Sequence, residues 1–356
     1  MNIPSPGRPW LFSPRFDGLL ILGPAFFSVG AVLLLPVGAR EELAAAPWMW
    51  LLVVVGIDVA HVYTTLFRTY LDRAEVESRW GLYFGVPVAC WIIGVCLYSL
   101  DALAFWRALA YLAVFHFVRQ QYGFFALYGR SRSALSSKFW QLDRVMIYAA
   151  TLVPLVFWHS RSRDFAWFVE GDFLRLPWSW IGEAALFVYA ALWIAYVMKE
   201  MWVFRRSGEF NLPQNLLLVG TALSWLVGIV LFNDDLIFTV TNVVAHGIPY
   251  TALVWATSGR ERVPGRWAPL FFLGLVLLLA FVEEGFWDGL IWGEHGELFP
   301  GFSSFSVVRN PEILKLLVPL LALPQATHYV LDGFIWKKRP SPAASVAGLP
   351  LERAVG

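Results

Sequence analysis

Long apolar runs recur along this sequence, and they constrain its fold more than any other feature. A helix needs about 20 predominantly apolar residues to cross the hydrocarbon core of a membrane, and about ten runs approach that length. Charged residues make up only 15% of the 356 residues, whereas soluble domains contain about 25%. The sequence therefore predicts an all-α fold, a polytopic bundle of about ten transmembrane helices. The expected spans are residues 16–37, 48–70, 80–100, 102–128, 139–159, 180–204, 213–232, 235–257, 267–283 and 313–336.

The charges between these spans alternate from one loop to the next. Basic residues precede the first span and follow each even-numbered span, including the tenth and last. The other loops are acidic or mixed. By the positive-inside rule, this alternation places both termini in the cytoplasm. The basic positions are Arg8, Arg15, Arg73, Arg79, Arg130, Arg132, Lys138, Arg205, Arg206, Arg260, Arg262, Arg266, Lys337, Lys338 and Arg339.

The chain is expected to form a single transmembrane helical domain, residues 1–339, followed by a short tail, residues 340–356. The tail is rich in Pro, Ala and Ser, and we expect it to be disordered in the cytoplasm. These features predict an integral, multi-pass membrane protein, located in the cytoplasmic membrane if the source is bacterial. The net charge of +1 does not indicate a nucleic-acid partner, because the cations serve the membrane topology.

Two loops on the expected outer side, residues 160–180 and 283–312, are longer than a connection requires. Both are rich in Trp, Phe and Gly. One interpretation is an interfacial aromatic belt lying on the membrane surface. The other is a lid over an outer entrance to the helix bundle.

Four of the expected helices carry one histidine each at a similar depth. These helices all run from outside to inside, and at about 1.5 Å per residue the histidines lie roughly 10–20 Å from the inner surface. Ionisable side chains inside a membrane are costly and mark functional sites. The four are His61, His116, His246 and His328. His159 and His295 fall in or beside the outer loops, so we do not expect them in the same cluster.

Each of the four histidines has a polar companion one turn away on its own helix. Imidazole is the commonest metal ligand, and a ligating histidine usually donates its second N–H to a carboxylate or amide. The sequence therefore predicts an intramembrane metal site with these companions behind the ligands, although either aspartate could itself be a ligand. The companions are Asp58, Gln120, Asn242 and Asp332. Further donors at similar depth, expected to line a substrate-binding or polar cavity, are Arg119, Tyr122, Tyr63 and Gln325.

A nitrogen-rich site without a thiolate suits non-haem iron best, with zinc or copper as alternatives. Iron surrounded by apolar helices indicates oxidative chemistry on a lipid or isoprenoid substrate that enters from the bilayer. We therefore expect a metal-dependent membrane oxygenase or oxidoreductase, for which the sequence identifies no redox partner. The HxxxH and HxxHH boxes of membrane desaturases and hydroxylases are absent from the sequence.

Two short segments, D58-V-A-H61 and F115-H116-F117, resemble the bacteriorhodopsin-related Brp/Blh family of membrane carotene-cleaving dioxygenases. Proteins of that family are polytopic and hold iron with a few intramembrane histidines on separate helices. The resemblance implies an iron-dependent oxygenase acting on an isoprenoid. It covers a small fraction of the chain, and the later part departs from the family, whose later histidines form a pair one turn apart. Here Asp332 follows His328 at that spacing.

Two other classes of protein remain open. Histidines on facing membrane helices can ligate haem b in an electron-transfer protein, although two such haems usually lie at different depths. A proton-coupled transporter would use Asp58, Asp332 and Arg119 as a relay, but the paired broken helices that often mark transporters are not evident in the sequence. A histidine in a membrane can also simply form hydrogen bonds between helices.

Overall fold

Helices are the only regular secondary structure in the part of the chain that the structure describes. This computed structural model describes residues 9–336, apart from residues 45 and 264, so the expected tail, residues 340–356, lies outside the described part. The elements are α1 (Pro14–Phe16), η1 (Asp17–Leu22), α2 (Gly23–Leu34), α3 (Val37–Ala44), α4 (Pro47–Trp50), η2 (Leu51–Val59), α5 (Ala60–Arg68), α6 (Arg73–Ser78), α7 (Trp80–Leu100), α8 (Ala102–Tyr128), η3 (Gly129–Ser131), α9 (Ala134–Ser137), α10 (Trp140–Ser160), α11 (Trp180–Ser207), α12 (Leu212–Trp225), η4 (Leu226–Leu231), α13 (Asp235–Val254), η5 (Trp255–Gly259), α14 (Arg260–Arg262), α15 (Ala268–Trp287), η6 (Asp288–Trp292), α16 (Pro311–Leu321) and α17 (Leu323–Ile335).

Among these described residues, 8 helices are long and apolar enough to cross a membrane, or 9 if the bent pair α16 and α17 forms one span. The structure thus shows the expected helical fold, with several long apolar helices of the kind found in multi-pass membrane proteins. The count of about ten and the cytoplasmic placement of both termini remain predictions. The difference in number comes from α10, which has 21 residues but is made more polar by Asp143 and Arg144 near its start.

The last expected span, residues 313–336, is not a single straight helix. Helices α16 and α17 meet at an angle of 41°, and Pro324 stands in the first turn of α17. Because proline lacks an N–H and its ring clashes with the preceding turn, a helix bends or restarts at such a position. The bend gives α17, which carries His328, a direction of its own.

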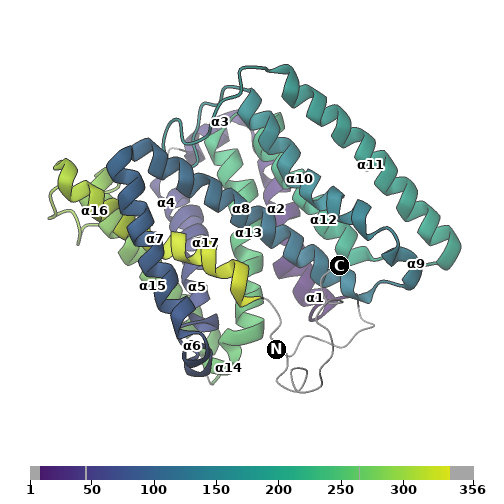
Figure 1. The fold of residues 1–356 in the computed structure, drawn as a ribbon, viewed down its shortest axis with the longest axis horizontal. Coiled ribbons are helices and arrows are strands. Elements are labelled where there is room, and N and C mark those ends of the chain that lie inside the picture. Colours follow the sequence, from purple (N-terminus) through teal and green to yellow (C-terminus); the bar gives the residue numbers. More distant parts are fainter. Residues whose placement is uncertain (1–8, 45, 264, 337–356) are drawn as a thin grey trace.

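Helix α13 lies near the centre of the bundle, and α8, α5 and α17 lie around it, as Figure 1 shows. In the most apolar stretch of the span that contains α13, 72% of the residues are buried, against 11% for α7 and 17% for α11. Helix α11 runs along one edge beside α10 (Figure 1). Helices α7 and α11 therefore present their apolar side chains outward, as expected of helices that face lipid.

The two central helices begin at aspartates that cap their first turns. Asp101 accepts a hydrogen bond from the N–H of Leu103 at the start of α8. Asp234 accepts one from the N–H of Ile237 at the start of α13. Such caps satisfy backbone donors that have no partner within the helix.

The loop between α10 and α11 packs inward on the ends of the helices. The Trp167 ring lies 5.2 Å from the Phe238 ring of α13 and 5.2 Å from the Phe117 ring of α8, between ring centroids. Asp172, which is buried, accepts hydrogen bonds from the backbone N–H groups of Phe168 and Val169 and fixes the turn. Burial of Asp172 in this loop raises the pKa of its carboxyl group. The loop therefore covers one end of the bundle.

Candidate metal centre

The four intramembrane histidines come from four helices and meet in the interior. Their exposed fractions are 1% for His61 on α5, 1% for His116 on α8, 0% for His246 on α13 and 2% for His328 on α17. No other group of three or more His, Cys, Asp or Glu side chains with metal-ligand spacing occurs among the described residues. The single histidines predicted on separate helices thus form one cluster, which could hold a metal ion.

All four imidazoles point their Nε2 atoms toward one another. The Nε2 atom of His116 lies 3.1 Å from that of His246 and 3.1 Å from that of His328. The Nε2 atoms of His246 and His61 are 3.2 Å apart. A metal–nitrogen bond of about 2.0–2.1 Å places neighbouring ligand nitrogens about 2.9 Å apart in a square and about 3.3 Å apart in a tetrahedron. The observed distances lie between these values.

The four rings follow a cyclic order around the common point. Neighbouring ring centroids are 4.7 Å (His61–His246), 4.8 Å (His246–His116), 4.5 Å (His116–His328) and 5.0 Å (His328–His61) apart. His61 and His116 face each other across the cycle at 6.3 Å, with ring planes only 15° apart. In a tetrahedron all pairs would be equally distant, so this order resembles a puckered square of ligands.

The outer nitrogens, Nδ1, point at groups suited to hold the rings. Thr65 Oγ1 lies 2.7 Å from His328 Nδ1. Asp332 Oδ2 lies 3.3 Å from His116 Nδ1, and Asp58 Oδ1 lies 3.7 Å from His61 Nδ1. Among the described residues, the Nδ1 atoms of His61, His116 and His246 form no hydrogen bond, so the two aspartates lie near their imidazoles without bonding them.

Three of the four predicted companions contact something other than the imidazole of their own helix. Whether Asp332 serves the histidine of its own helix or that of a neighbouring helix is open in the sequence, and in the structure it lies behind His116 of α8. The predicted donors Gln120 and Asn242 do not bond an imidazole nitrogen. Gln120 donates to the backbone carbonyl of His246 at 2.9 Å, and Asn242 donates to the carbonyl of Phe238 one turn earlier. Amide side chains readily bond nearby backbone carbonyls. These two amides are therefore not available to the imidazole nitrogens.

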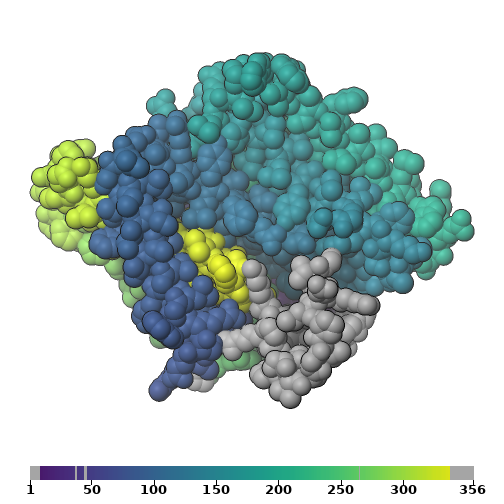
Figure 2. Space-filling model, in the orientation of Figure 1, coloured from purple at the N-terminus to yellow at the C-terminus, as the bar shows by residue number. Residues whose placement is uncertain are grey.

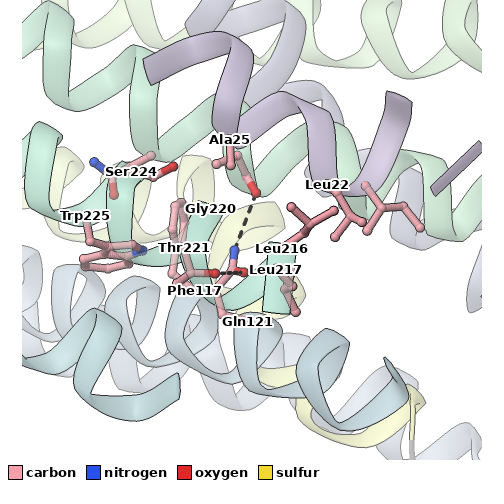
Figure 3. Close-up of a pocket in the computed structure, with 13 residues that line it drawn as sticks. Leu22, Ala25, Phe117, Gln121, Leu216, Leu217, Gly220, Thr221, Ser224 and Trp225 are labelled. Atoms are coloured by element: carbon pink, nitrogen blue, oxygen red, sulfur yellow. Dashed lines mark hydrogen bonds between the residues drawn. The ribbon is translucent and has the colours of Figure 1, made fainter. Parts of the chain in front are cut away.

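The backbone next to His246 is held by two consecutive glutamines of α8. Pro249 has no N–H, so the carbonyl of Ala245 one turn earlier lacks its helical donor. Gln121 Nε2 donates to that carbonyl at 3.5 Å, and Gln121 accepts a hydrogen bond from Thr221 at 2.9 Å. Figure 3 shows Gln121 and Thr221 joined in this way within a small pocket beside Phe117. Together with Gln120, these contacts fix α13 where it carries His246.

Close helix packing also depends on Gly247, the residue after His246. A Cβ atom at this position would lie 2.8 Å from Ile57 Cγ2 and 3.0 Å from the Ile57 carbonyl oxygen. A glycine is therefore required for α13 to approach η2 so closely. This approach places His246 beside His61.

Aromatic side chains enclose the cluster. The Phe117 ring is stacked on His246 with centroids 3.6 Å apart and planes 8° apart. Tyr250 OH lies 3.2 Å from the Thr65 hydroxyl. Thr65 and Phe117 are site residues that were not predicted from the sequence. Thr65 stands one turn after His61 in a T-T pair, which is the only signal of it in the sequence.

The four predicted cavity residues separate into two pairs. Arg119 and Tyr122 line a cavity together with His116 and Asp332. Tyr63 instead packs against an apolar cluster of α5, α13 and α15. Gln325 is half-buried on α17, and it does not line the cavity that contains Arg119.

Of the two remaining histidines, His295 lies in a loop and stacks on Trp50, with ring centroids 4.4 Å apart. His159, at the end of α10, contacts the Tyr111 hydroxyl at 2.7 Å. Neither belongs to the cluster, as expected.

Comparisons with protein families, curated proteins and solved structures give no match.

Proposed function

We propose that this chain is a membrane metalloenzyme that holds iron with His61, His116, His246 and His328 and carries out oxidative chemistry on a lipid or isoprenoid. The observation that carries the proposal is the orientation of the four imidazoles, with every Nε2 directed inward. Four buried imidazoles with their nitrogens facing one another are costly inside a membrane protein unless a ligand compensates for them.

The protonation of the rings explains why that ligand is a cation. A neutral imidazole carries one N–H, and a carboxylate beside Nδ1 holds the proton there. Asp332, 3.3 Å from His116 Nδ1, is placed to do this, whereas Asp58, 3.7 Å from His61 Nδ1, lies near its ring but beyond hydrogen-bond distance. The inward Nε2 atoms then carry lone pairs, which repel one another at 3.1–3.2 Å unless a metal ion accepts them. Imidazole ligands suit iron, copper, nickel and zinc, and of these the puckered square fits tetrahedral zinc least well.

Bound iron would supply oxygen activation, and the protein would position the hydrocarbon beside it. A cavity of about 270 Å³ reaches His116 and Asp332, and most of its lining is apolar or aromatic. Such a cavity accepts a hydrocarbon directly from the bilayer and keeps water away from the site. The resemblance to carotene-cleaving dioxygenases supports an isoprenoid as one candidate.

The same geometry disfavours the haem alternative. The neighbours of each ring in the cycle lie with centroids 4.5–5.0 Å away. They therefore fill the plane that a porphyrin would need between two axial histidines. A bare ion fits four convergent imidazoles, whereas a macrocycle does not.

Oxygen uptake tests the proposed reaction. The purified, iron-loaded protein in lipid nanodiscs is given β-carotene or an oleoyl lipid, and each assay is run once with and once without ascorbate as reductant. The protein should consume O2, and the added hydrocarbon should be lost. His246→Ala, matched in lipid and protein content, should show neither change. Protein that contains iron but consumes no O2 with either hydrocarbon would contradict the oxygenase assignment.

A further inference from the structure

The cavity beside the metal centre extends along α8 toward the end of that helix. It begins at His116 and continues past Phe124 and Leu127 to Arg130. The distance from Arg119 to Arg130 along the helix is about 16 Å at 1.5 Å per residue. Helices α13 and α17 form its other walls, through residues such as Leu253 and Trp336.

The N-terminal segment contributes Leu11 and Phe12 to the lining. The buried Asp17 carboxylate accepts the backbone N–H of Leu11 at 2.5 Å and that of Phe12 at 3.1 Å. This segment is therefore anchored against the bundle, so the cavity has a fixed apolar wall at that point.

Arg119 brings a positive charge into this largely apolar cavity. It belongs to a membrane span, Ala102–Ser131, and stands one turn after His116. Its Nη1 donates to the Tyr148 hydroxyl at 2.6 Å, and its guanidinium lies 4.9 Å from the centre of the Tyr122 ring. Within the described residues, no carboxylate lies within ion-pair distance of Arg119.

Arg119 lines this cavity but is itself exposed, whereas arginines that lie deeper in the fold bond backbone carbonyls or a carboxylate. Arg132, for example, lies 3.1 Å from the Asp143 carboxylate. The cavity contains one carboxylate, Asp332, but that group faces His116 Nδ1 at 3.3 Å and accepts the Trp336 indole N–H at 2.6 Å. An arginine at membrane depth without an anionic partner is costly. The cavity thus offers a charge that a neutral hydrocarbon would leave uncompensated.

We propose that this cavity binds an amphiphile with an anionic head group, with the head group at Arg119 and the hydrocarbon chain along α8 toward Leu127. A carboxylate or phosphate would form charge-assisted hydrogen bonds with the guanidinium. The aromatic and aliphatic walls would cover the chain. The inference deepens the proposed function and rests on it in one respect: the part of the ligand next to the head group would lie nearest the metal centre.

Binding of palmitate compared with hexadecanol tests this inference, because the two share a chain and differ in head-group charge. The full-length protein is measured in a neutral detergent. The wild type should bind palmitate about tenfold or more tightly than hexadecanol, as expected for a charge-assisted contact. Arg119→Gln should lose this preference and bind both alike, whereas Arg119→Lys should keep part of it.

Arg107→Gln is the matched control, because Arg107 is an accessible arginine of the same helix that bonds the Gly171 carbonyl away from the cavity. It should keep the wild-type preference. Retained hexadecanol binding by Arg119→Gln shows that the cavity is intact. Equal affinity of the wild type for the two probes would overturn the inference. The inference would also be overturned if Arg130→Gln lost the preference for palmitate while Arg119→Gln kept it.

Metal content, measured on the same samples, separates this inference from the proposed function. Arg119→Gln should contain as much metal as the wild type. A wild type without metal would contradict the proposed function while leaving the palmitate comparison fully interpretable.

Discussion

At the scale of single residues, the site depends on groups that orient the imidazoles from behind. Thr65 contacts His328 Nδ1, Asp332 faces His116 Nδ1, and Asp58 lies near His61 Nδ1. Such partners fix the tautomer and raise the basicity of a ligand, a role worth about 10–100-fold in metal affinity or activity. Their effect on metal binding should therefore be graded, and smaller than that of a ligand.

Thr65→Val tests this role with almost no change of shape. It removes the hydroxyl partner of His328, so iron affinity should fall about 10–100-fold. Competition with a chelator of known affinity measures the change. Thr64→Val is the control, since the buried Thr64 hydroxyl bonds only the carbonyl of His61 within its own helix. Equal iron affinity in both variants would mean that Thr65 does not orient a ligand.

The two aspartates should behave differently from the histidines. Asp58→Asn and Asp332→Asn should retain iron at saturating concentration but lose oxygen uptake, because the amide no longer holds the imidazole proton as a carboxylate does. His61→Ala and His328→Ala should lose both. Iron content per mole and oxygen uptake are compared across the four variants. An aspartate variant that cannot be loaded with iron would show that this carboxylate is itself a ligand.

At the scale of elements, the geometry of the site comes from how the helices approach one another. Matched depth of the four histidines could be predicted from the apolar runs, because each residue advances a helix by a fixed rise. Which side chains meet across helices could not be predicted. That Asp332 of α17 faces His116 of α8 depends on the 41° bend before α17. The bond from Gln121 to Ala245 arises from Pro249, whose effect on its neighbours is visible only after packing.

Gly247→Ala tests the close approach of α13 and η2. The new methyl group would meet Ile57 at 2.8–3.0 Å, so α13 must move and carry His246 away from His61. Iron affinity should fall and the thermal midpoint of unfolding should drop. Gly274→Ala on α15, where no atom lies within 4 Å of the added Cβ, should change neither. Unaltered iron affinity in Gly247→Ala would show that the approach does not position His246.

A buried ion network joins α10 and α11 away from the site. Lys199 Nζ lies 2.6 Å from Asp143 Oδ1, and all but 3% of the Lys199 side chain is buried. Removing Lys199 leaves Arg132, 3.1 Å away, as the remaining cationic partner of Asp143 and takes the ion-pair partner from Glu200, so it costs up to about 3–5 kcal/mol. Lys199→Met should therefore lower the thermal midpoint of unfolding without changing iron content. Arg205→Met, at an exposed position of the same helix, should have no effect, and equal midpoints for the two variants would contradict the prediction.

At the scale of the whole molecule, the fold class followed from the apolar runs, whereas the orientation in the membrane rests on the basic loops. Both termini are expected in the cytoplasm. A reporter fused to the C-terminus, active only on one side of the membrane, checks this. An active reporter on the outer face would reverse the orientation and would place the loop between α10 and α11 on the cytoplasmic side.

The central claim is that four buried histidines of one chain hold one metal ion. Elemental analysis of the purified protein, combined with its visible absorption spectrum, tests this most directly. We expect about one iron per chain without the Soret band of haem, and loss of that iron in His246→Ala. Protein purified after growth in iron-rich medium that contains no metal, or a His246→Ala variant that keeps its full metal content, would contradict it.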